Sequence, residues 1–220
     1  MGPSPPGISA YARFTLLADF SKQPMTDQSN PGFQPWRGDD FGRGPLGSKR
    51  LLVLGEAHYS TIPADNHEKL TRCLVRDIRD GRKSIAYFTK VASLLNSYTD
   101  TQQNVWNAIA FYNFIQEMVG TAARIRPTAA MWAAASQPFA QVLAKLKPDR
   151  VLVTGSDVWH ALSDNFMPAW KSAPVVTETE EPIFEWSSPS GQHIRATWIN
   201  HPSSLGFSPV KWERIATLIA

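Results

Sequence analysis

The chain has 220 residues, of which 43% are hydrophobic and 19% are charged, and this length and composition suit one globular domain with a sizeable core. Its formal net charge of +3 is compatible with a polyanionic partner but does not establish one. The single cysteine excludes an internal disulfide framework, and without a run of about 18 apolar residues we expect a soluble, cytoplasmic protein with no membrane partner.

Proline and glycine are frequent in the first 48 residues, which we expect to form an arm in front of a domain that spans 49–220. A short helix is predicted over 12–20. Between 24 and 48, the helix breakers are too dense for a helix or a central strand. The pattern leaves open whether this stretch is an ordered arm over the core or a mobile flap.

Order is expected to begin with a continuous apolar run at 50–54, which predicts a strand buried on both faces. The pattern over 64–81 predicts a helix. Asp65 and Glu68 suit a capping box at its start, and Gly81 suits its end.

A second helix is predicted over 84–96, followed by a helix that ends near Ala108 and a short buried strand at 109–113. We expect the helix over 64–81 to face the core with Leu70, Leu74 and Ile78. The helix over 84–96 is expected to do so with Ile85, Phe88, Ala92 and Leu95.

Two helices are predicted at 126–136 and 138–148, the second with Pro138 at its first position. The segment 149–162 has the pattern of an apolar strand, a glycine turn and a helix. Three short β segments and a closing helix follow, at 173–178, 182–186, 193–199 and 208–220. Strands that alternate with helices predict an α/β fold, a three-layer α/β/α sandwich around a central, mostly parallel sheet.

Four polar segments directly follow predicted strands. They are "GEAHYS" (55–60), "FYNF" (111–114), "GSD" (155–157) and "NHPSSL" (200–205). Ligands of such sheets bind off the carboxyl ends of the strands, so we expect these four segments to share one pocket.

The first two of these segments carry groups suited to reading and hydrolysing a substrate. Glu56 can activate a water or, alternatively, cap the following turn, while His58 and Tyr59 are expected to face the pocket. Asn113 lies among aromatic residues that include Phe111. Its amide offers a donor and an acceptor side by side, which fits the edge of a nucleobase, although a buried asparagine can equally be satisfied by backbone groups.

The other two segments carry groups suited to anions. Ser156 lies in a tight turn whose amides can bind an anion, although such a turn is more often plain packing. His201 can donate a hydrogen bond to charge that develops on a substrate oxygen. Ser203 and Ser204 expose hydroxyl and amide groups that can contact a phosphate. Leu205 is either part of the core or a wedge for a base stack.

Several other chemistries lack their signatures in this chain. There is no phosphate-binding G-x-x-x-x-G-K-[ST] loop, no G-x-S-x-G nucleophile motif, no G-x-G-x-x-G dinucleotide motif and no H-E-x-x-H zinc motif. His160 and His193 have no partners at metal-ligand spacing, so we expect no metal site.

Together, the segments resemble the uracil-DNA glycosylase superfamily. "LLVLGEAHYS" is similar to its first motif, "INHPSSLGF" to its last, and the resemblance runs from about residue 50 to 220. It implies hydrolysis of the N-glycosidic bond of a flipped-out uracil or related base in DNA, which leaves an abasic site. It further implies DNA as the partner, a monomer and no cofactor, because Cys73 alone cannot supply the four cysteines of the iron–sulfur branches.

The resemblance also implies roles for single residues. His201 would stabilise negative charge on the departing base, Ser203 would contact the DNA backbone, and Leu205 would fill the gap left by the flipped nucleotide. Glu56 stands where some branches have a water-handling glutamate.

Three positions of the first motif complete this comparison. The aspartate of the best-studied branch is replaced by Ala57, and the usual proline by His58. Tyr59 falls where a tyrosine blocks the methyl group of thymine.

These departures leave three rival interpretations. The chain is a glycosylase for a damaged or enzymatically modified base, such as a deaminated purine or a phage-modified pyrimidine. Alternatively, it is a DNA-binding protein of the same fold that does not cut. The third is an α/β domain of unrelated function that shares two short loops by chance.

Overall fold

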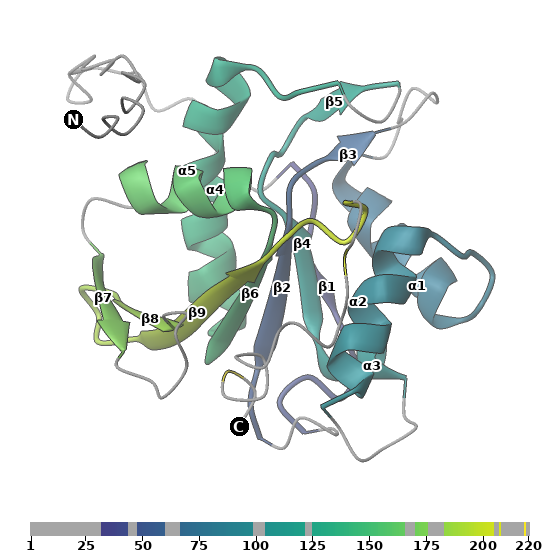
Figure 1. The fold of residues 1–220 in the computed structure, drawn as a ribbon, viewed down its shortest axis with the longest axis horizontal. Coiled ribbons are helices and arrows are strands. Elements are labelled where there is room, and N and C mark those ends of the chain that lie inside the picture. The colour runs from purple at the N-terminus through teal and green to yellow at the C-terminus, as the bar shows by residue number, and fades with distance from the viewer. Residues whose placement is uncertain are drawn as a thin grey trace, which may run out of the picture.

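The described residues of the computed structural model form a central sheet of seven strands (Figure 1). The strands lie in the spatial order β1 (Trp36–Arg37), β4 (Ala110–Asn113), β2 (Leu51–Gly55), β6 (Arg150–Thr154), β9 (His193–Ile199), β8 (Ile183–Ser187) and β7 (Lys171–Val175). The structure describes residues 32–43, 48–59, 67–98, 104–121, 125–165, 170–175, 183–204, 207 and 218.

The middle of the sheet is parallel. Strand β2 pairs in parallel with β4 on one side and with β6 on the other, and β6 pairs in parallel with β9. The edges are antiparallel, β1 against β4 and β8 and β7 beyond β9. A second, two-stranded parallel sheet joins β3 (His58–Tyr59) to β5 (Met118–Gly120).

Helices cover both faces of the sheet (Figure 1). One core cluster joins side chains of the sheet to α1 (Leu70–Arg79), α2 (Ala86–Asn96) and α3 (Val105–Ala108). The other cluster joins the opposite sheet face to α4 (Ala129–Leu146) and α5 (Ser156–Asn165). This arrangement confirms the predicted three-layer α/β/α fold. No helix among the described residues combines the length and apolar character needed to cross a bilayer.

Three of the parallel strands, β2, β4 and β6, were predictable because each is a mainly apolar run buried on both faces. Every residue of β2, β4 and β6 is buried, which matches the patterns at 50–54, 109–113 and 149–154. The helices α2, α3 and α5 also lie where the patterns placed them. The strands β8 and β9 match the predicted segments at 182–186 and 193–199, whereas β7 begins two residues before the segment predicted at 173–178, whose last three residues lie outside the described residues.

The prediction of two helices at 126–136 and 138–148 is wrong, because α4 runs through Pro138 without a break. Proline lacks the N–H that would bond the carbonyl of Ala134, four residues earlier. Ala134 is exposed, so water can reach that part of the helix. Buried residues on both sides of the proline, Ala135 and Phe139, pack into the same cluster and keep the helix continuous.

The ends and inner faces of α1 and α2 differ in detail from the prediction. Helix α1 begins after Lys69, without a side-chain cap, and a 3-10 turn at His67–Lys69 precedes it. Its fully buried residues are Thr71 and Val75, whereas the three expected core residues are only partly buried. Ile85 precedes α2 and is exposed, because it lies outside the first helical turn. Gly81 closes α1 with a positive φ of 72°, as predicted.

The described part of the N-terminal arm lies on the domain. Phe33, Trp36 and Phe41 are buried, and β1 extends the sheet by two residues at its edge. This packing corresponds to an arm over the core. The helix expected over 12–20 and the capping residue Asp65 lie outside the described residues. So does the closing helix at 208–220, apart from Leu218, which is helical and buried.

Candidate functional site

The carboxyl ends of β4, β2, β6 and β9 meet at one edge of the sheet. The chain leaves β2 to form β4 on one side and returns to form β6 on the other, and its connecting helices cover opposite faces. In α/β proteins, ligands generally bind at the strand ends where the strand order reverses in this way. Gly55 lies opposite Asn113, and the amide of Gly155 donates to the carbonyl of Ile199 (2.9 Å). The four polar segments therefore share this edge.

Glu56 lies directly after β2 with 11% of its side chain exposed. Its Oε1 accepts from the hydroxyl of Tyr59 (3.2 Å), and its Oε2 lies 3.5 Å from Nη1 of Arg126. Burial raises the pKa of Glu56, and nearby Asp157 raises it further, whereas Arg126 and the Tyr59 hydroxyl lower it. Burial is the largest of these effects. Glu56 is thus a carboxylate that takes up a proton more readily than usual.

Tyr59 stands beside this carboxylate with 37% of the residue exposed. Burial and the neighbouring Glu56 raise the pKa of its phenol to about 12, so it remains a hydroxyl donor at neutral pH. It therefore belongs to the site, although its hydroxyl is committed to Glu56.

His201 follows β9, and its ring is held from two sides. The backbone N–H of Ser203 donates to Nδ1 (3.2 Å), and the ring of Tyr87 lies 5.2 Å away, centre to centre. Burial, and to a lesser extent Arg126, lowers the pKa of His201. A neutral imidazole whose Nδ1 accepts a hydrogen bond carries its proton on Nε2. His201 therefore presents Nε2–H as a donor.

Asn113 ends β4 and is buried. Its backbone carbonyl accepts from the side-chain amide of Gln116 (2.6 Å). Its own side-chain amide forms no hydrogen bond to another described residue. Its Oδ1 lies above Gly55, where a β-carbon would collide with it. Glycine at 55 thus makes room for an amide that is available to a ligand.

Tyr87 and Arg126 belong to the site, although the sequence interpretation missed both. The hydroxyl of Tyr87 shares a hydrogen bond of 2.6 Å with Thr154 at the end of β6. The guanidinium of Arg126 bridges Glu56 and Asp157, at 3.5 and 3.1 Å. No local motif marks either residue. Tyr87 lies directly before Phe88, which was expected to face the core, but its own position on the predicted helix gave no signal.

His58 and Phe111 are not placed at the open edge. His58 is 5% exposed, its Nε2 lies 2.8 Å from Oγ1 of Thr71, and its ring packs edge-on against Phe33. The expectation that it faces the pocket is wrong, because its side chain packs between Thr71 of α1 and Phe33, while the next residue, Tyr59, is the one that reaches Glu56. Phe111 is a core residue packed against Phe88, and only its ring end lies near Gly55.

The residues expected to contact DNA lie at the same edge as His201. Ser203 and Ser204 are exposed in the turn after β9, where the amide of Ser204 donates to the carbonyl of His201 (2.8 Å). Ser156 is the first residue of α5 and is partly buried. Leu205 lies outside the described residues. Among the described residues, no group of three or more histidine, cysteine or acidic side chains could hold a metal ion.

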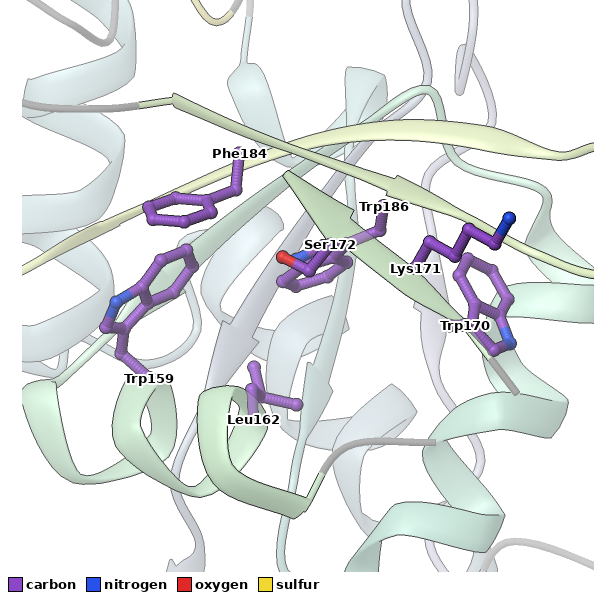
Figure 2. Close-up of a pocket in the computed structure, with 7 residues that line it drawn as sticks. All are labelled: Trp159, Leu162, Trp170, Lys171, Ser172, Phe184 and Trp186. Atoms are coloured by element: carbon purple, nitrogen blue, oxygen red, sulfur yellow. The ribbon is translucent and has the colours of Figure 1, made fainter. Parts of the chain in front are cut away.

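A separate cavity of about 130 Å³ lies between α5 and the strands β7 and β8 (Figure 2). Aromatic rings dominate its lining, which consists of Trp159, Leu162, Trp170, Lys171, Ser172, Phe184 and Trp186. None of the residues discussed above contributes to it, so it is distinct from the strand-end site.

No protein-family model matches the chain, and a search of curated proteins finds no significant match.

Proposed function

We propose that this protein is a DNA glycosylase that hydrolyses the N-glycosidic bond of a flipped-out uracil or related base and leaves an abasic site. We further propose that it acts in the cytoplasm as a monomer and needs neither a cofactor nor an iron–sulfur cluster. The support comes from the geometry of three side chains, together with the resemblance of the two loops that carry two of them.

The tautomer of His201 carries the proposal. Departure of an anionic base is the difficult step of this reaction, so a donor aimed at the developing anion lowers the barrier. A protonated histidine would pair with any phosphate, whereas a neutral Nε2–H suits an oxygen whose charge grows during the reaction. The Ser203 N–H and the lowered pKa both favour this neutral donor.

Asn113 supplies the group that reads the base. Extrusion of a base from the duplex costs roughly a few kcal/mol of stacking and pairing, which contacts in the pocket must offset. An amide offers one donor and one acceptor in the arrangement that the edge of uracil requires. Because the Asn113 amide is buried at the strand ends without a described partner, a base edge would satisfy it.

Glu56 is the general base that accepts a proton from the attacking water. In the proposed step, the oxygen of a water bonds to C1′ of the sugar while the C1′–N bond breaks. The electron pair of that bond leaves with the base, and the proton of the water passes to Glu56. This role requires the ionised carboxylate, which Arg126 and Tyr59 favour against the effect of burial.

The turn after β9 supplies the contacts to DNA. Ser203 and Ser204 are exposed beside His201, where their hydroxyls and amides can contact phosphates that flank the flipped nucleotide. By resemblance, Leu205 fills the gap in the base stack. The backbone amides at the start of α5, at Ser156, contact a further phosphate.

A panel of oligonucleotides tests the proposal. Single strands and duplexes that carry uracil, hypoxanthine or 5-substituted pyrimidines are incubated with the protein, and the free base is measured by mass spectrometry. We expect uracil to be released by wild type. Glu56→Gln should slow release without weakening DNA binding, and Asn113→Ala should change which base is released. Glu185→Gln, a change of a glutamate on β8, is the matched control.

The panel also separates the rival functions. Release of hypoxanthine or a modified pyrimidine in place of uracil would move the substrate to a damaged or modified base. Salt-dependent binding of these oligonucleotides without release of any base would contradict catalysis and would indicate a DNA-binding protein.

A further inference from the structure

Arg126 connects three separate parts of the strand-end site. It lies between β5 and α4, and its Nη1 is 3.1 Å from Asp157 in the first turn of α5 and 3.5 Å from Glu56 after β2. The backbone at this point is well anchored. Pro127 is buried, and the hydroxyl of Thr128 caps α4 by accepting from the amide of Met131 (3.3 Å).

Arg126 places a positive charge between two carboxylates at the strand ends, those of Glu56 and Asp157. Without it, the carboxylates of Glu56 and Asp157, which both contact Nη1 of Arg126, would have no cation between them, and Asp157 already raises the pKa of Glu56. The same cation lowers the pKa of Glu56 and that of His201. A single positive charge therefore favours an ionised glutamate and a neutral histidine, which are the states that hydrolysis and base departure require.

We propose that Arg126, anchored by Asp157, is a positioning residue that holds the Glu56 carboxylate at the strand ends. This inference rests on the proposed glycosylase function for its catalytic meaning. The alternative role for an exposed arginine at such an edge is contact with a DNA phosphate. Its side chain is 70% exposed, so the two roles must be separated by experiment.

The charged and titratable groups that contact Glu56 or its partner Arg126 come from three parts of the described chain. Tyr59 comes from β3, Arg126 from the segment between β5 and α4, and Asp157 from α5. Changes at Arg126 and Asp157 should therefore act on Glu56 in opposite directions. Arg126→Gln removes the cation, Arg126→Lys keeps a cation, and Asp157→Asn removes the competing carboxylate.

The first measurement uses the free full-length protein and requires no activity. The Glu56 carboxyl and the His201 ring are titrated by NMR in wild type and in each variant. We expect Arg126→Gln to raise the pKa of both groups, Arg126→Lys to restore them in part, and Asp157→Asn to lower the pKa of Glu56. Arg82→Gln is the matched control, because Arg82 also bridges two carboxylates, Asp77 and Asp80, on an exposed surface.

The second measurement is the pH dependence of base release. Exposed ion pairs contribute little, so Arg126→Gln should lose only about two- to fivefold more kcat at pH 5.5 than at pH 8. The KM for DNA should stay close to that of wild type, and Arg126→Lys should recover most of the loss.

Two outcomes would overturn the inference. One is a Glu56 pKa that does not respond to Arg126→Gln. The other is a loss of activity that is equal at all pH values and appears in KM, which would make Arg126 a phosphate contact. If wild type released no base from any oligonucleotide, the proposed function would fail, while the titrations would still decide whether Arg126 controls the two groups.

Discussion

His58 provides a sharp test of the packing beside the site. It is buried and bonded to Thr71, and burial lowers its pKa from an ordinary 6.5 to about 4. The unfolded chain therefore binds a proton at a higher pH than the folded chain. Above pH 6.5 the His58 ring is neutral in both the folded and the unfolded chain, and its full contribution to the unfolding free energy is present. As the pH falls from 6.5 through 4, the unfolded state gains protons first and stability is lost.

The size of this loss of unfolding free energy follows from the pKa shift of His58. A difference of about 2.5 pKa units, at 1.36 kcal/mol for each unit, corresponds to about 3 kcal/mol of unfolding free energy between pH 6.5 and pH 4. Other groups also titrate in this window, so the effect must be isolated. His58→Gln removes the titrating ring but keeps an amide nitrogen near the place of Nε2, within reach of Thr71.

Urea unfolding of wild type and His58→Gln over a series of pH values is the assay. The wild-type curve should fall about 3 kcal/mol further than that of the variant between pH 6.5 and pH 4. Parallel curves, or an NMR titration of His58 near its ordinary pKa of 6.5, would refute the buried neutral histidine and the contact of β3 with α1.

Two further substitutions test the packing of α4 and the room for the base-reading amide. Pro138→Ala should raise the unfolding free energy by about 2 kcal/mol, because a proline inside a helix costs up to about 3 and restricts the unfolded chain by roughly 0.4–1. A melting temperature of Pro138→Ala no higher than that of wild type would indicate that the helix breaks at residue 138. Gly55→Ala adds a β-carbon that collides with Oδ1 of Asn113, so it should change which base is released, as Asn113→Ala does. An unchanged preference in the oligonucleotide panel would show that the amide does not depend on this space.

The sequence predicts those parts of the fold whose signal is local. The strands β2 and β6 are apolar runs, and their burial on both faces is the reason for that pattern. The continuity of α4 was not predictable from the sequence, because a proline ordinarily ends a helix and only packing on both sides of Pro138 overrides it.

In the candidate site, too, the residues with a local signal were predicted and those with remote partners were not. Glu56 and His201 were identified because each follows a strand within a short motif. Tyr87 and Arg126 were missed because their partners are remote, 67 residues away for Thr154 and 70 for Glu56. Contacts of this kind depend on the order of strands in the sheet, which no single segment encodes.

The most direct test of glycosylase function is single-turnover release of uracil at neutral pH by wild type and His201→Ala. His193→Ala is the control, since His193 begins the strand that His201 follows. If His201 stabilises the departing base, His201→Ala should release uracil about 100- to 1000-fold more slowly, while its DNA binding and unfolding free energy stay close to those of wild type. Equal rates for wild type and His201→Ala, or no release by wild type, would contradict the account.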